Sequence, residues 1–143
     1  MQANTNGRLL VGFSKSGWGA LSLLLRNPTV FHRAAAWDTG IRVDTGPMSK
    51  EERAERIALD WGSAENFETH RLSTLINTRG RELGSEARLF YFNTAGKRAT
   101  GGVEIHRLLV ENQIPHRYVL EPHRRHSWDS GWMPEAIAFL VSE

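Results

Sequence analysis

The chain has 143 residues, 40% of them hydrophobic, with a formal net charge of +2 and no cysteine. These values predict one globular domain over residues 1–143, and they exclude disulfides and thiolate metal sites. The sequence has neither a long basic run for nucleic acid nor an apolar stretch near the ~20 residues that cross a bilayer, so we expect no nucleic-acid and no membrane partner.

The first half of the chain predicts two strands and two or more helices. An apolar run over residues 8–13 predicts a short buried strand, and leucines at helical spacing predict a helix over residues 17–26. A second strand is expected over residues 32–38, followed by a loop over residues 39–47. Ser49 stands three residues before Glu52, which is the spacing of a capping box and predicts a helix from Ser49 to about Asp60.

The second half repeats this alternation. One or two helices are expected before Gly80, and residues 87–94 form the strongest strand pattern of the chain. The remaining predicted elements are a loop over residues 96–102, a helix over 103–112, a strand over 116–122, a loop over 123–131 and a terminal helix with Pro134 in its first turn.

The alternation of strands and helices predicts an α/β fold with about four parallel strands and flanking helices. Ligands of such sheets bind at the carboxyl ends of the strands. Three chemically capable residues are expected there: Ser14 after the first strand, Asp38 after the second and His126 after the fourth. Their convergence from distant parts of the chain is the main functional signal of the sequence.

The segment Gly12-Phe13-Ser14-Lys15-Ser16-Gly17 joins a predicted strand to a predicted helix. Such a turn is typical of a nucleophile elbow, which needs small residues two positions before and after the serine. Ser16 replaces the second glycine of the strict pattern, and a plain glycine-flanked turn is the alternative interpretation. In an elbow, the Lys15 N–H at the helix N-terminus would donate to an oxyanion, while the Lys15 side chain points to solvent.

With His126 added, the chain resembles the α/β-hydrolase superfamily, and within it the branch of esterase D-like and feruloyl- or acetylxylan-esterase-like proteins. The resemblance rests on "LLVGFSKSGWGALSLLLRNPTVF" and "NQIPHRYVLEPHRRHSWDSGWMPEAIAFL", which contains His126-Ser127-Trp128. It implies a serine hydrolase that cleaves a small carboxylic ester through an acyl-enzyme, with Ser14 as nucleophile and His126 as base, and with no cofactor.

The acid of the triad is less clear from the sequence. In the family it usually follows the third predicted strand, but the loop from Asn93 to Gly102 contains no carboxylate. Asp38 is the better substitute, although "WDTG" is also good turn chemistry and a loop-capping role is the alternative. We expect Glu104 to lie in the next helix, and Asp129 is too close to His126 in sequence for an easy triad.

The six histidines do not predict a metal site. His123 and His126 have H-x-x-H spacing, and His106 and His116 lie upstream of them. No acidic or thiolate partner completes an evident ligand set, so we expect no metal.

The resemblance covers only the second half of a normal hydrolase domain. The predicted sheet would therefore expose an edge strand and an apolar side, which a partner chain or a second copy could cover. A fragment, a truncated gene product and a half-domain that pairs with another chain all fit, and "QANTNGRLLVGF" favours truncation because it resembles a family interior. A catalytically silent half-domain acting only in assembly is the alternative function, and the localisation stays open.

Overall fold

One parallel sheet organises the structure, a computed structural model that describes residues 7–39, 42–94 and 99–142. Its strands lie in the order β1-β2-β3-β4, and each pairs in parallel with the next. The strands are β1 (Leu9–Phe13), β2 (Arg33–Trp37), β3 (Leu89–Thr94) and β4 (His116–Glu121). The predicted α/β fold with four parallel strands is confirmed.

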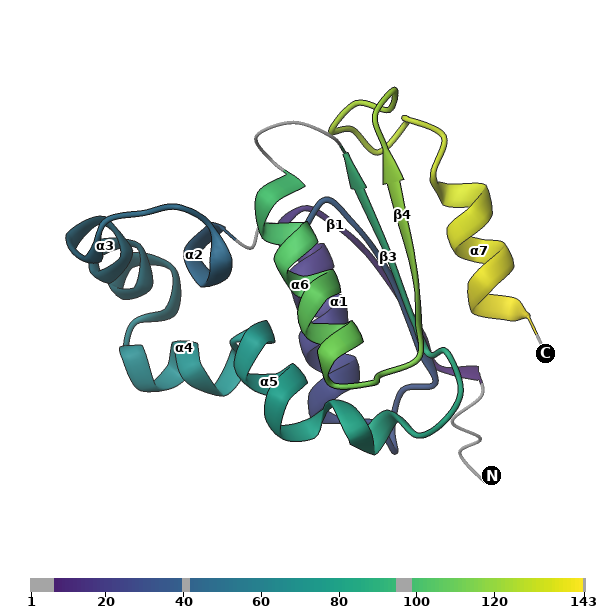
Figure 1. Cartoon of the computed structure of the whole chain (residues 1–143), viewed down its shortest axis with the longest axis horizontal. Helices are drawn as coiled ribbons and strands as arrows, with labels where there is room; N and C mark the ends of the chain where they lie inside the picture. The colour runs from purple at the N-terminus through teal and green to yellow at the C-terminus, as the bar shows by residue number, and fades with distance from the viewer. Residues whose placement is uncertain (1–6, 40–41, 95–98, 143) are drawn as a thin grey trace.

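Helices cover both faces of the sheet (Figure 1). They are α1 (Lys15–Arg26), α2 (Arg42–Thr45), α3 (Lys50–Trp61), α4 (Ala64–His70), α5 (Leu72–Arg79), the 3-10 helix η2 (Gly80–Leu83), α6 (Ala99–Glu111) and α7 (Met133–Val141). Helices α1, α5 and α6 pack on one face, and α7 packs on the other. Within the described ranges no helix is both long enough and apolar enough to cross a membrane.

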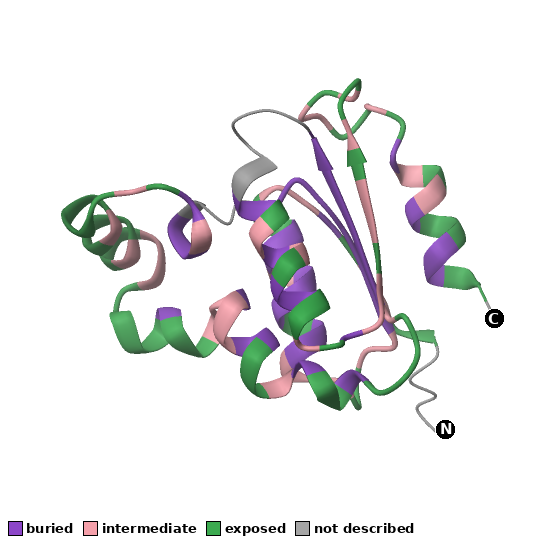
Figure 2. Cartoon of the chain, in the orientation of Figure 1, coloured by how far each residue is buried: buried purple, intermediate pink, exposed green. Residues whose placement is uncertain are grey.

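The sheet separates two hydrophobic clusters. The larger one joins Leu24, Tyr91 and Leu109 with other side chains from α1, β3 and α6, and the smaller one joins Trp37 to Trp132 and Phe139 at α7. Strand β3 is buried along its whole length, whereas β4 is only partly covered (Figure 2). The interior position of β3 explains why its sequence is a continuous apolar run.

Two predicted loops are partly helical. The loop expected over residues 39–47 contains the short helix α2, and α6 begins at Ala99, four residues before the predicted start at Val103. The sequence places Gly102 in a loop, but in the structure it lies in α6, where a Cβ would stand 2.5 Å from Asn93 Nδ2. This glycine therefore permits close packing of α6 on β3. Residues 40–41 and 95–98, which belong to these predicted loops, lie outside the described residues.

Candidate active site

Ser14, Asp38 and His126 all follow the carboxyl ends of strands. The ladder between neighbouring strands continues one residue beyond β1 and β2: the Ser14 N–H donates to the Trp37 carbonyl at 2.9 Å. The Asp38 N–H donates in the same way to the Phe92 carbonyl at 3.0 Å. Ser14 and Asp38 therefore follow adjacent strands, and both lie where the carboxyl ends of the strands meet.

The turn at Ser14 has a backbone conformation that side chains rarely adopt. Its φ is 53° and its ψ is −120°, between the end of β1 and the start of α1. A non-glycine residue in such a region indicates strain that surrounding contacts must hold in place. A Cβ on Gly12 would stand 2.2 Å from the Ser16 carbonyl oxygen, so only glycine fits two residues before Ser14.

The Ser16 hydroxyl fastens this turn to the strand before it. Ser16 Oγ accepts the Phe13 N–H at 3.0 Å and donates to the Phe13 carbonyl at 2.8 Å. Successive residues of a strand direct their backbone N–H and C=O groups to opposite sides. Since the Ser14 N–H points toward β2, the backbone groups of Phe13 point away from β2, to the side of β1 that has no neighbouring described strand. Ser16 thus satisfies groups that a neighbouring strand would otherwise bind. Sequence reasoning missed this role, although serine hydroxyls often bond to nearby backbone.

Asp38 and His126 are in direct contact. His126 Nδ1 lies 3.0 Å from Asp38 Oδ2, and the carboxylate is nearly buried, with 2% of its side chain exposed. The same carboxylate accepts the Thr94 N–H at 2.6 Å and the Thr94 hydroxyl at 2.8 Å. A buried carboxylate needs such donors, and its bond to Nδ1 favours the tautomer that leaves a lone pair on His126 Nε2.

The His126 ring also packs on the elbow strand. Its centroid lies 4.5 Å from that of Phe13, the residue before Ser14, and the Phe13 ring contacts Trp128 at 5.3 Å. Neither His126 nitrogen forms a hydrogen bond with Ser14 Oγ in the part of the chain that the structure describes. Catalytic hydrogen bonds of free enzymes are often long and tighten when substrate binds.

Lys15 begins α1 directly after Ser14. Its N–H is one of the first four of the helix, which have no partner inside the helix, and it lies at the positive end of the helix dipole. The Lys15 side chain is 83% exposed, with Nζ 3.5 Å from Asp60 Oδ1 of α3. The predicted solvent-facing orientation of this side chain is therefore observed.

The two other carboxylates considered in the sequence do not join this site. Glu104 lies within α6, as expected, and accepts a hydrogen bond from Arg107 Nε at 2.9 Å. Asp129 accepts a hydrogen bond from the Ser127 hydroxyl, which holds the pKa of the Asp129 carboxyl below its usual value. Each is thus engaged by a neighbour in its own segment.

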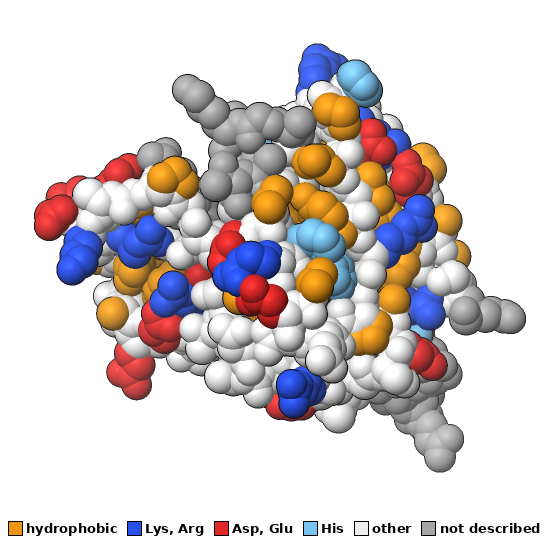
Figure 3. Space-filling view, in the orientation of Figure 1, with side chains coloured by type: hydrophobic (Ala, Val, Ile, Leu, Met, Phe, Trp, Pro, Cys, Tyr) orange, Lys and Arg blue, Asp and Glu red, His pale blue; other side chains and the backbone are white. Residues whose placement is uncertain are grey.

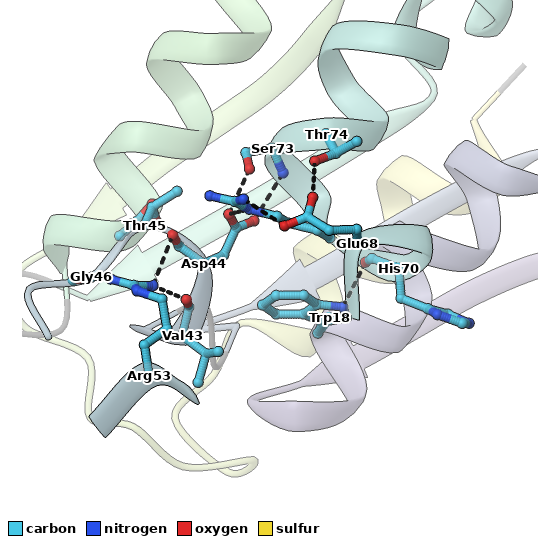
Figure 4. Close-up of polar contacts among 12 residues, drawn as sticks. Trp18, Val43, Asp44, Thr45, Gly46, Arg53, Glu68, His70, Ser73 and Thr74 are labelled. Carbon is cyan, nitrogen blue, oxygen red and sulfur yellow. Dashed lines mark hydrogen bonds and ion pairs between the residues drawn. The ribbon is translucent and has the colours of Figure 1, made fainter. Parts of the chain in front are cut away.

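The helices between β2 and β3 are tied to the helix that follows Ser14. Trp18 Nε1, in the first turns of α1, donates to the His70 carbonyl at the end of α4 at 3.0 Å (Figure 4). The Trp18 ring also packs against Trp61 and Phe67, with centroids 5.4 and 6.1 Å away. This aromatic contact places α3 and α4 beside α1.

An ion pair between Arg71 and the buried Asp44 carboxylate stabilises the same helical segment. Asp44 accepts hydrogen bonds from Arg71 Nε at 2.7 Å, from the Ser73 hydroxyl at 2.6 Å and from the Ser73 N–H at 2.9 Å (Figure 4). Arg53 donates to the carbonyls of α2 and its following turn, among them Gly46 at 3.0 Å. These bonds anchor the short helix α2, which sequence propensity does not predict.

A cavity of about 330 Å³ opens beside this ion pair. It is lined by Asp44, Thr45, Arg71, Ser73, Glu104 and Leu108. The cavity is separate from the contact between His126 and Asp38. Its carboxylate at Asp44 is already satisfied by three protein donors, so the group has a structural role.

Comparisons with known proteins identify solved structures that have a similar fold. No protein-family model and no curated protein matches the chain. Among solved structures, a "putative dipeptidyl aminopeptidase IV" from Bacteroides ovatus superposes with a TM-score of 0.69 at 14% identity, over 96% of this chain and 19% of that one. A ferulic acid esterase superposes with a TM-score of 0.63 at 11% identity, over 99% of this chain and 53% of that one. The chain thus spans about half the length of the esterase and shares a hydrolase-type α/β fold with both proteins.

Proposed function

We propose that this chain carries the nucleophile, base and acid of a serine hydrolase that acts on carboxylic esters. The observation that supports this most is the 3.0 Å contact between His126 Nδ1 and Asp38 Oδ2, at the same edge of the sheet as the strained Ser14. A serine on a sharp strand-to-helix turn, a histidine and a buried carboxylate are the parts that acyl transfer needs.

In the proposed reaction each of these groups has a distinct role. Ser14 Oγ attacks the ester carbonyl while His126 Nε2 takes its proton, and the Lys15 N–H donates to the resulting oxyanion. Collapse of the tetrahedral intermediate breaks the ester bond, and the imidazolium returns the proton to the leaving alcohol. Water then attacks the acyl-enzyme with His126 again as base, which releases the acid and restores Ser14. Asp38 holds the imidazole tautomer and stabilises the imidazolium.

The ester class is supported by the ferulic acid esterase among the structural neighbours and by the aromatic surface near His126. Trp128 is 48% exposed and packs on the Phe13 ring that touches His126. Trp132, by contrast, is fully buried and stacked on Trp37, so it belongs to the core. Trp128 is the side chain we assign to contact with the substrate.

A catalytically silent half-domain is the second candidate function. It is favoured by the edge position of β1 in the sheet, where Val11 has 40% of its surface accessible. The chain also spans only 19% of the aminopeptidase chain and 53% of the esterase chain described above. In this alternative, a partner chain or a second copy pairs with β1, and the Ser14 turn has only a structural role.

Turnover of a p-nitrophenyl ester distinguishes the two functions. The hydrolase proposal expects turnover by the wild type that is abolished in Ser14→Ala and His126→Ala. Matched controls are Ser85→Ala, an exposed serine in the loop before β3, and His123→Ala, an exposed histidine in the His126 loop, and both should retain turnover. A folded wild type with no turnover above that of Ser14→Ala would overturn the proposal and favour the silent half-domain.

A further inference from the structure

Two histidines lie against each other between helix α6 and strand β4. His106 Nδ1 of α6 lies 2.8 Å from His116 Nε2 at the start of β4, and the ring centroids are 5.0 Å apart. Histidine side chains are visible together on the face over α6 and β4 (Figure 3). This pair lies at the amino end of β4, whereas Ser14, Asp38 and His126 follow the carboxyl ends of strands. It is therefore distinct from the candidate active site.

The backbone fixes the tautomer of His116. Its Nδ1 lies 2.7 Å from the Ile114 carbonyl oxygen, which can only accept a hydrogen bond. The proton of a neutral His116 ring is consequently on Nδ1, and Nε2 presents a lone pair toward His106. Metal-binding histidines commonly have this arrangement, in which one ring nitrogen donates to a backbone carbonyl and the other binds the ion.

The ring of His106 is held by stacking. It lies on the Tyr118 ring with centroids 4.1 Å apart and an interplanar angle of 9°. The stacking and the contact with His116 together fix the position of the His106 ring beside β4.

We propose that His106 and His116 form a two-histidine site for a divalent late transition-metal ion. Two imidazole nitrogens bound to one such ion at about 2.0–2.1 Å stand roughly 3 Å apart, close to the separation seen here. Binding requires both rings to turn so that their lone pairs point at the ion, and it requires His106 to carry its proton on Nε2 in place of Nδ1. Imidazole ligands suit Cu²⁺, Ni²⁺ and Zn²⁺, and Cu²⁺ should bind most tightly.

The protein supplies two ligands to this site, and water fills the other positions of the ion. Among the described residues, no group of three or more His, Cys, Asp or Glu side chains could hold a metal. The ion would link α6 to β4, because one ligand comes from each element. Its effect is expected on stability, with ester turnover unchanged.

A Cu²⁺ titration followed by calorimetry and electron paramagnetic resonance tests the proposal. The wild type should bind one ion with nitrogen coupling in its spectrum, and its melting temperature should rise. His106→Gln and His116→Gln should each weaken binding at least about 10-fold, the size typical for disruption of a metal site. His32→Gln and His123→Gln are matched controls that should bind as the wild type does.

Equal Cu²⁺ affinity in the wild type and both site variants would overturn the proposal, and so would the absence of binding by the wild type. In that case the pair is only a hydrogen bond between α6 and β4. If a site variant fails to fold, ¹⁵N spectra of the wild-type imidazoles with Zn²⁺ decide the question. The site requires selective shifts of His106 Nδ1 and His116 Nε2, and unchanged signals contradict it.

Discussion

His126 Nδ1 lies 3.0 Å from Asp38 Oδ2, although 88 positions separate the two residues in the chain. The contact forms because β2 and β4 end at the same edge of the sheet on either side of β3. Thr94, at the end of β3, holds the Asp38 carboxylate through its N–H and its hydroxyl. The acid and the histidine are thus positioned by three successive strands.

Asp38→Asn should lower kcat by about 10³–10⁴ with little change in KM. The amide would present a donor to His126 Nδ1 and favour the wrong tautomer, in which Nε2 carries the proton. The measurement is ester turnover by folded variants, with Asp129→Asn, an exposed carboxylate in the His126 loop, as the control. An Asp38→Asn variant with wild-type kcat would show that the carboxylate has no part in the reaction.

Gly12→Ala should destabilise the fold by about 2 kcal/mol or more, because its Cβ would overlap the Ser16 carbonyl at 2.2 Å. Gly19→Ala is the matched control in α1, where no atom of the described ranges lies within 4 Å of the added Cβ. That substitution should stabilise the helix by about 0.5–1 kcal/mol. Urea unfolding measures both values, and similar stabilities for the two variants would contradict the packing described for the elbow.

Ser16→Ala should lower the free energy of unfolding by about 1–2 kcal/mol, since two hydrogen bonds to Phe13 are lost. The Phe13 amide should also exchange faster with deuterium. Ser22→Ala, in the same helix, removes a buried hydroxyl that forms no hydrogen bond with any described residue, and should leave stability equal or slightly higher. Unchanged exchange of the Phe13 amide in Ser16→Ala would argue against the two hydrogen bonds between Ser16 and Phe13.

The stability of the fold should fall as the pH drops below about 6.5. Burial, followed by the proximity of His116, lowers the pKa of His106. Burial, followed by the charges of Arg33 and Arg88, lowers the pKa of His32. The unfolded chain therefore binds more protons than the folded one between the ordinary pKa of 6.5 and the lower folded values, so stability is lost as pH falls through this window.

Urea unfolding between about pH 7.5 and about pH 5 measures this dependence. His106→Gln and His32→Gln should each make it shallower. His123→Gln, which changes an exposed loop histidine, should not. The same slope in all four proteins would contradict a role for the partly buried rings of His32 and His106.

Much of the fold could be predicted because its strands are short apolar runs separated by helical patterns. Ser49 caps the N-terminus of α3 as expected, with its hydroxyl accepting the Glu52 N–H at 3.0 Å. The start of α6 could not be predicted, since the paired glycines Gly101 and Gly102 have the composition of a loop. Gly102 instead allows α6 to approach Asn93, a contact that depends on the folded sheet.

The candidate site was only partly predictable for a similar reason. The position of Ser14 follows from a local pattern, a strand followed by a glycine-flanked turn and a helix. Asp38 could be selected because it ends the neighbouring strand, but its donors from Thr94 depend on the pairing of β2 with β3. The hydrogen bonds of the Ser16 hydroxyl to Phe13 could not be predicted, because a pattern of small residues does not show where a hydroxyl points.

Covalent labelling by a fluorophosphonate probe, mapped by mass spectrometry, tests the proposed hydrolase most directly. The probe phosphonylates a serine whose hydroxyl is activated by a histidine and whose surroundings stabilise an oxyanion. We predict an adduct on Ser14 of the wild type, equal labelling of Ser85→Ala, and none at this position in His126→Ala. The absence of an adduct on Ser14 of the folded wild type would contradict the proposed role of Ser14 as nucleophile. Equal labelling of Ser14 in the wild type and in His126→Ala would contradict the proposed role of His126 as base.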